Sequence, residues 1–184
     1  MMDSYIDITI KPDEEMRENV LLNKVYTKLH KILSEQKLTD VGVSFPRFKV
    51  LLGNVIRLHG VEARLLELEA MNWRGGLSGY CDVSAAQKVP EGTAYRTISR
   101  KQSNMTEAKL RRLIKRGSIS PEAAKAYKAK MFKKGLDNPY LELESTSNGH
   151  KYRRYIQFGE LRSKPVEGGF DQFGLSKTST VPWY

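Results

Sequence analysis

The first element of the predicted fold comes from Tyr5-Ile6-Asp7-Ile8-Thr9-Ile10, which Pro12 ends. Its apolar and polar side chains alternate with a period of two, which predicts a strand with all three isoleucines on one face. The acidic residues 13–15 suit the first turn of a helix, and apolar residues at helical spacing continue that helix to about Gln36. Strand, strand, helix and strand patterns follow at 41–45, 55–59, 61–71 and 80–89. The resulting order, βαββαβ, is typical of a ferredoxin-like domain.

The remainder of the chain predicts a smaller α/β domain. Pro90-Glu91-Gly92 marks a boundary, so we expect an α+β protein with domains at 1–91 and 92–184. A helix over about 105–116, here called the arginine helix, ends at Gly117, and a second helix starts at Ser120-Pro121 and closes at Gly135. Alternating segments at 140–144 and 151–158, joined by turn residues, predict a β-hairpin.

The composition excludes several classes of protein. The chain has 184 residues, of which 40% are hydrophobic, enough to bury a core. One cysteine and three histidines cannot form a Cys/His zinc cluster, and the single Cys81 fits a reducing compartment. The first residues lack a secretory leader pattern, and no apolar run approaches the roughly 20 residues of a membrane span. We therefore expect a soluble, cytoplasmic protein with no membrane partner.

The positive charge is concentrated in one segment. The net charge is +10, and residues 95–134 carry 13 basic and 2 acidic side chains. By contrast, residues 1–94 carry 12 basic and 13 acidic side chains, and residues 135–184 carry 6 of each. Such concentration favours a binding surface for a polyanion, where neutralised phosphates release counterions. A solvated, lysine-rich helix face is the alternative.

The arginine helix predicts how that surface binds. A narrow apolar stripe of Leu110, Leu113 and Ile114 would dock it. Its remaining positions present a cationic ridge of Lys109, Arg111, Arg112, Lys115 and Arg116. Arginine makes bidentate contacts with phosphate and with guanine, so the ridge suits nucleic acid. The major groove of long A-form RNA is too narrow for side chains, which favours the open end of a short RNA hairpin, and duplex DNA remains an alternative.

The candidate chemistry is metal-free RNA cleavage. The GxxxxGK[ST], HExxH, GxSxG and DxDxDG motifs do not occur, and the basic half lacks a carboxylate cluster for a two-metal nuclease. The ribose 2′-OH is an internal nucleophile that needs only orientation and proton transfer. His30, at the edge of the first helix's apolar stripe, is the candidate base, and hydroxyls at 145–147 are candidate partners. Each also suits a purely structural role, as a half-buried histidine and as turn formers.

Several short motifs occur in one order along nearly the whole chain. They are Leu29-His30, Gly42-Val-Ser-Phe-Pro46, Tyr95-Arg96 through Gln102, the arginine helix, Ser145-x-Ser147, Phe173-Gly-Leu-Ser-Lys177 and Val181-Pro-Trp183. Together they resemble the type I-F CRISPR repeat-processing endoribonuclease, which cuts precursor CRISPR RNA at the base of a repeat hairpin. The resemblance implies a ferredoxin-like amino-terminal domain. It also implies that the cleaved hairpin stays bound and is delivered into a multi-subunit interference complex.

The resemblance also implies residue roles in a reaction that we expect to need no metal or cofactor and to yield 2′,3′-cyclic phosphate and 5′-hydroxyl ends. His30 would be the general base, with leaving-group protonation as a further role. Ser145 would orient the nucleophilic 2′-OH, with Ser147 as a nearby helper. A non-catalytic hairpin RNA-binding module, which would bind RNA and leave it intact, is the alternative function.

The remaining roles that the resemblance implies are contacts with RNA. Arg112 and Arg116 would enter the major groove and Arg100 with Gln102 would read bases beside the cleavage site, while Tyr152 would stack on the closing base pair. Two departures from the family pattern stand out. Phe173 occupies the place of an expected tyrosine, so stacking survives and a phenolic hydroxyl is lost. Lys109 and Lys115 replace expected arginines, which weakens bidentate readout.

Overall fold

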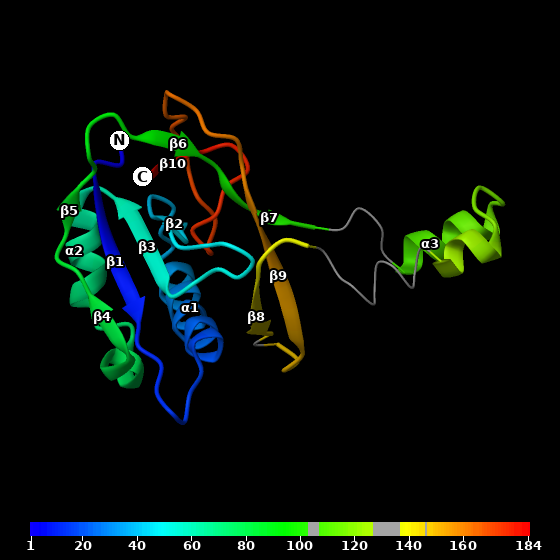
Figure 1. Cartoon of the computed structure of the whole chain (residues 1–184), viewed down its shortest axis with the longest axis horizontal. Helices are drawn as coiled ribbons and strands as arrows, with labels where there is room; N and C mark the ends of the chain where they lie inside the picture. The colour runs from blue at the N-terminus through cyan, green and yellow to red at the C-terminus, as the bar shows by residue number, and fades with distance from the viewer. Residues whose placement is uncertain (103–106, 127–136, 146) are drawn as a thin grey trace. The chain divides into compact units, whose positions relative to one another are not determined.

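The structure, a computed structural model, describes residues 1–102, 107–126, 137–145 and 147–184. These fall into two compact units, Met1–Arg100 with Pro139–Tyr184, and Lys101–Asn138, both drawn in Figure 1. Helices combined with antiparallel sheets confirm the α+β class. The ferredoxin-like designation and the domain boundary at residues 91 and 92 stay predictions.

The first half of the larger unit follows the expected order of elements. Its bounds are β1 (Ser4–Ile10), α1 (Glu18–Glu35), β2 (Gly42–Ser44), β3 (Val55–Gly60), α2 (Glu62–Ala70), the 3-10 helix η1 (Gly75–Tyr80), β4 (Cys81–Val83) and β5 (Gln87–Lys88). The strands form one sheet in the order β2-β3-β1-β4, with β5 also paired to β1, and every pair is antiparallel (Figure 1).

The single strand expected over 80–89 is divided into η1, β4 and β5. Residues 84–86 separate the two strands, and the hydroxyl oxygen of Ser84 accepts a hydrogen bond of 2.9 Å from the backbone N–H of Asp7. A side chain thus takes the place of a backbone acceptor at this point, which interrupts the ladder.

The remaining strands form two further sheets. Their bounds are β6 (Ala94–Arg96), β7 (Ile98–Lys101), β8 (Tyr140–Glu144), β9 (Lys151–Phe158) and β10 (Val181–Trp183). β10 pairs with β6, and the other three lie in the order β7-β9-β8. The predicted hairpin is confirmed, since β8 and β9 pair antiparallel from Tyr140↔Tyr155 to Glu144↔Lys151.

The smaller unit contains helix α3 (Glu107–Lys115) and a helical segment at 121–126. The expected start of the arginine helix at about 105, and the second helix beyond 126, lie outside the described residues.

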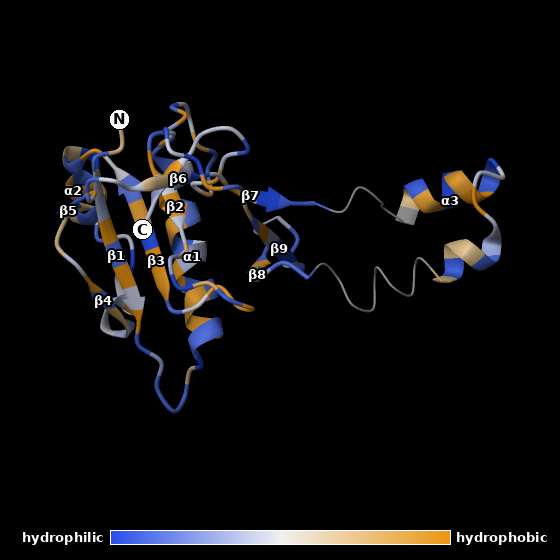
Figure 2. Ribbon diagram, turned by 45° about the horizontal axis from the view of Figure 1, so that its top comes forward, coloured by the Kyte–Doolittle hydropathy of each residue, from blue (hydrophilic) through white to orange (hydrophobic). Residues whose placement is uncertain are grey.

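The core of the larger unit lies between the sheet and its helices. β1 alternates strictly, so that Ile6, Ile8 and Ile10 are buried on one face as predicted. They pack into one cluster with the buried stripe of α1, visible as orange bands in Figure 2. Burying each such aliphatic side chain contributes about 1.5–3 kcal/mol, which fixes which face of β1 meets the helices.

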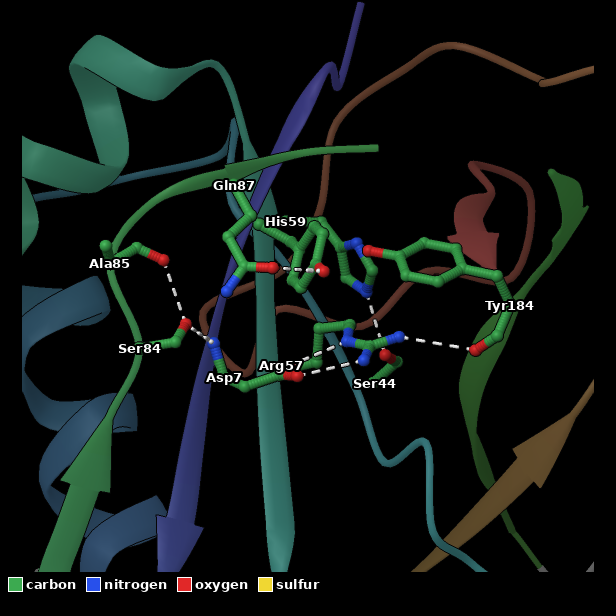
Figure 3. Close-up of polar contacts among 9 residues, drawn as sticks. Asp7, Ser44, Arg57, His59, Ser84, Ala85, Gln87 and Tyr184 are labelled. Atoms are coloured by element: carbon green, nitrogen blue, oxygen red, sulfur yellow. Dashed lines mark hydrogen bonds and ion pairs between the residues drawn. The ribbon is translucent and has the colours of Figure 1, made fainter. Parts of the chain in front are cut away.

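The opposite face of β1 and β3 carries a polar cluster, shown in Figure 3. Arg57 donates from Nε and Nη2 to the two carboxylate oxygens of Asp7, at 2.7 and 2.9 Å. Its Cζ also lies 4.7 Å from the ring centroid of Tyr5 and 4.4 Å from that of Tyr184. The guanidinium is held on the sheet by the carboxylate of Asp7 and the ring of Tyr5, and it holds Tyr184 there through the face of that ring.

His59 lies fully buried beside this cluster (Figure 3). Its Nε2 is 2.8 Å from the Ser44 hydroxyl, whereas its Nδ1 has no hydrogen-bond partner within the described part of the chain. Burial, and after it the charge of Arg57, lowers the pKa of His59 to about 3. The folded protein therefore holds a neutral imidazole at pH values where an unfolded chain would protonate it.

This difference predicts a pH-dependent stability. The pKa of His59 is depressed by folding, so its contribution is complete above about pH 6.5 and declines as the pH falls toward 3. Between pH 7 and pH 5 the wild type should lose about 2 kcal/mol more unfolding free energy than His59→Asn. Urea titrations at both pH values measure this, with the exposed His150→Asn as control, and equal losses in all three proteins would contradict it.

Candidate active site

His30 has a fixed orientation on α1. The half-buried ring places Nδ1 2.8 Å from the backbone carbonyl oxygen of Gln172. A carbonyl oxygen can only accept, so Nδ1 donates its hydrogen in this bond. In the neutral ring, Nε2 then carries the lone pair and is the nitrogen able to accept a proton.

The aromatic ring of Phe173 stacks on that imidazole. The two ring centroids are 3.6 Å apart and the planes differ by 6°. The hydroxyl of the buried Tyr26, one turn earlier on α1, donates to the Phe173 carbonyl oxygen at 2.6 Å. Burial raises the pKa of Tyr26, so this hydroxyl keeps its proton and remains a donor. Helix α1 thus holds residues 172 and 173 by two hydrogen bonds and one ring contact.

The turn that presents Phe173 is built by Asp171 and Gly174. One carboxylate oxygen of Asp171 accepts from the backbone N–H of Phe173 at 2.8 Å and of Leu175 at 3.0 Å. Gly174 has φ +70°, and a Cβ there would collide with the side chain of Val43. Its carbonyl oxygen accepts from the Val43 N–H at 2.9 Å. The sequence motifs at 42–46 and 173–177 are therefore joined by a backbone hydrogen bond.

The candidate hydroxyls follow β8. The Ser145 N–H donates to the His150 carbonyl oxygen at 2.8 Å, which closes the hairpin turn. The Ser145 and Ser147 hydroxyl oxygens are 2.9 Å apart and hydrogen bonded to each other. Thr146, between them, lies outside the described residues. The structure therefore brings the Ser145 and Ser147 hydroxyls together, and their roles toward RNA stay predictions.

Helix α1 also contacts β8, the strand that directly precedes Ser145. The side-chain oxygen of Asn23 accepts from the Glu142 N–H at 3.0 Å. A groove of about 580 Å³ lies along this contact, lined by α1, η1 and the β8–β9 hairpin. Asn23 and Thr27 line it from the helix, and His30, seven residues after Asn23 and three after Thr27, lies on the same helical face. On the opposite wall Glu144 directly precedes Ser145, so the groove runs along the two elements that carry the candidate groups.

The predicted site residues divide between the two units. The larger unit holds His30, Arg100, Ser145, Ser147, Tyr152 and Phe173, and the smaller holds Gln102, Lys109, Arg111, Arg112, Lys115 and Arg116. Contacts bring together His30 with Phe173, and Ser145 with Ser147. Arg100 and Tyr152 are half-buried on β7 and β9, and Gln102 is exposed. Their roles toward RNA stay predictions.

The predicted apolar stripe and cationic ridge of the arginine helix lie on different faces of α3. Leu110 is buried and the other two apolar residues are partly buried. The five basic side chains of the ridge are exposed. The helix thus presents its cations outward, as a polyanion-binding surface requires.

Comparison with known proteins identifies the family. The family model described as CRISPR-associated protein (Cas_Csy4) matches residues 5–184. This chain belongs to that family. It is 38% identical over 184 residues to a CRISPR-associated endonuclease Cas6/Csy4 from Escherichia coli (strain UTI89 / UPEC), and 36% identical over 187 residues to one from Pseudomonas aeruginosa (strain UCBPP-PA14). Both matches cover all of this chain and all of the relative, so the family that the motifs indicated is confirmed.

Within this Cas_Csy4 chain, sequence reasoning missed Arg154. Its side chain is 7% exposed, and its Cζ lies 3.5 Å from the ring centroid of Phe173. A signal was present, because the inner positions of β9 run Tyr152, Arg154, Ile156. A charged residue at an inward position of an alternating strand departs from the pattern and indicates a special environment.

The described ranges contain no group of three or more His, Cys, Asp or Glu side chains that could hold a metal ion. Among the same residues, no helix combines the length and apolar character needed to cross a membrane.

The hydrogen bond from Tyr26 to Phe173 predicts a stability effect. Tyr26→Phe would leave the Phe173 carbonyl oxygen without its donor, so the unfolding free energy should fall by about 1–3 kcal/mol. Urea unfolding measures this loss. Tyr80→Phe is the matched control, because the Tyr80 hydroxyl forms no hydrogen bond with another described residue. A loss no larger than that of the control would show that this bond does not hold the turn.

Proposed function

We propose that this protein is a metal-independent endoribonuclease that cleaves precursor CRISPR RNA at the base of the repeat hairpin. The observation that carries the proposal is the fixed imidazole of His30, with Nδ1 committed to Gln172 and Nε2 left to accept a proton. Membership of the Cas_Csy4 family supports it, as do the printed names of the two relatives, both CRISPR-associated endonucleases.

This geometry supports the following reaction. Nε2 of His30 takes the proton of the ribose 2′-OH, while Ser145, hydrogen bonded to Ser147, orients that hydroxyl. The 2′-oxygen bonds to phosphorus and the bond from phosphorus to the 5′-oxygen breaks. The leaving oxygen takes a proton, which the imidazolium can return. The products are a 2′,3′-cyclic phosphate and a 5′-hydroxyl, and no step requires a metal ion.

Recognition of the hairpin is assigned to both units. The exposed ridge of α3 would bind the hairpin's major groove, mainly through Arg112 and Arg116. Arg100 and Gln102 would read bases beside the cut, and Tyr152 would stack on the closing base pair. Contacts with the hairpin survive cleavage, so the protein would retain its product and carry it into a type I-F interference complex.

The proposal includes the finer architecture and location. The antiparallel order β2-β3-β1-β4, with α1 and α2 as the two crossovers, supports a ferredoxin-like domain at residues 1–91. Residues 92–184 would form the RNA-binding domain. The protein would act in the cytoplasm, where its RNA is made.

Cleavage of a synthetic repeat hairpin in excess EDTA tests the function. The wild type should cut it, and His30→Ala should slow single-turnover cleavage by about 10²–10⁴-fold while hairpin affinity stays nearly unchanged. Lys31→Ala, at the next and exposed position of α1, is the control and should cut at the wild-type rate. RNA with a 2′-deoxyribose at the scissile position should bind and remain intact.

Two results would contradict the proposal. Tight binding with RNA left intact by the wild type would indicate a non-catalytic RNA-binding module. Undiminished cleavage by His30→Ala would remove this imidazole from the mechanism. Analysis of the product ends then decides the chemistry, since a metal-dependent hydrolysis would not leave a cyclic phosphate.

The ridge of α3 predicts a salt-dependent affinity. If Arg112 contacts phosphate, Arg112→Ala should weaken hairpin binding and reduce the slope of log affinity against log salt by about 1. Arg17→Ala, an exposed arginine of the larger unit, removes the same charge and should leave the slope unchanged. An unchanged slope with lost sequence preference would mean that Arg112 reads a base. A matching DNA hairpin that competes equally well would favour a DNA binder.

A further inference from the structure

Phe173 carries a second partner on the ring face opposite His30. The His30 ring centroid and the Arg154 Cζ lie 3.6 and 3.5 Å from the centroid of Phe173. Two groups at this separation from one centroid would overlap if they shared a face, so they must occupy opposite faces. The order in space is therefore imidazole, phenyl ring, guanidinium. Arg154 reaches this position from β9, and His30 from α1.

Among the described residues, the guanidinium of Arg154 has no ion-paired carboxylate. The residue is 7% exposed, and none of the ion pairs within the described ranges includes it. Its Nε is buried without a hydrogen-bond partner in that same part of the chain. Attraction to the face of Phe173 offsets only part of the cost of burying a charge and leaving a donor unpaired. A buried, unpaired cation of this kind is suited to receive an anionic group.

A second arginine lies within electrostatic range. Arg100 is half-buried on β7, the strand next to β9. Burial, and after it the charge of Arg154, lowers the pKa of Arg100. The negative charge of Asp171 raises the pKa of Arg100. One oxygen of Asp171, however, already accepts two backbone hydrogen bonds in the turn that holds Phe173. Two like charges thus share a site in which one oxygen of the nearby carboxylate is committed to the turn.

We propose that Arg154, with Arg100 beside it, binds a backbone phosphate of the RNA strand that passes the His30–Phe173 stack. A phosphate supplies both the negative charge and the acceptor oxygens that the guanidinium of Arg154 lacks, and the planar fork of arginine matches its geometry. This inference rests on the proposed function for the identity of the ligand. It adds an RNA-contacting residue that none of the sequence motifs marks.

Arg154→Leu tests the contact, with a hairpin RNA that carries 2′-deoxyribose at the scissile position as the probe. The variant should bind about tenfold more weakly, and its slope of log affinity against log salt should fall by about 0.7, the value for one single-strand phosphate. Arg154→Lys should keep most of the slope. Because apolar replacement of a buried ion is often tolerated, Arg154→Leu should fold, and Arg154→Met serves if urea unfolding shows that it does not.

Arg153→Leu is the matched control. It removes the same charge from the next residue of β9, whose side chain is exposed and whose Cζ lies 4.3 Å from the ring centroid of Tyr140. Equal losses in the Arg153 and Arg154 variants would reduce the effect to general charge and overturn the proposal. Unchanged affinity and slope in Arg154→Leu would overturn it as well, even if cleavage slowed, since Arg154 would then act only through Phe173.

The cleavage assay and the binding assay distinguish failure of the proposed function from failure of the phosphate contact. If the wild type fails to cut the cleavable hairpin in EDTA while Arg154→Leu loses affinity and slope, the nuclease assignment fails and the phosphate contact stands. If the wild type cuts and Arg154→Leu binds normally, the nuclease stands and the contact is excluded.

Discussion

The close approach of the 171–175 turn to β2 is the constraint on which the candidate site depends. Val43 donates to the Gly174 carbonyl oxygen at 2.9 Å, and the space that a Cβ at Gly174 would need is filled by Val43. Because Gly174 is held against the sheet, the two residues before it, Gln172 and Phe173, lie against α1. The carbonyl of Gln172 and the ring of Phe173 then meet His30 together, so that one backbone contact fixes both the tautomer and the plane of the imidazole.

The sequence predicts those parts of the fold that follow from local periodicity. β1, α1 and the hairpin were predicted because burial of one face enforces a period of two or of 3.6 residues. The division of the 80–89 strand was not, because it depends on one hydroxyl, that of Ser84, which replaces a backbone acceptor. His30 could be chosen as a candidate from its place at the edge of an apolar stripe. Its hydrogen bond to a carbonyl 142 residues away could not, because nothing local encodes that contact.

Arg154 and Phe173 show how the same limit applies to charge. An arginine at an inward strand position is visible in the sequence, but its meaning depends on the register of β7, β9 and β8 and on a ring supplied by a distant turn. The two ring contacts of Phe173 also explain why phenylalanine is compatible with this site. Both neighbours of Phe173 contact the faces of the ring, and neither contact requires the phenolic hydroxyl that the family pattern led us to expect.

On the proposed function, binding and chemistry are assigned largely to different parts of the chain. The exposed ridge of α3 belongs to one unit, and the imidazole and paired hydroxyls belong to the other. Contacts that hold substrate and product equally do not lower the barrier of the chemical step. Under the proposed function they would keep the hairpin bound after the cut, which would suit a protein that passes its product on and does not need to turn over rapidly. Acceleration must then come from groups whose interactions strengthen as the 2′-oxygen attacks, and the proposed function assigns this role to Nε2 of His30, which the bond from Nδ1 to Gln172 leaves able to accept a proton.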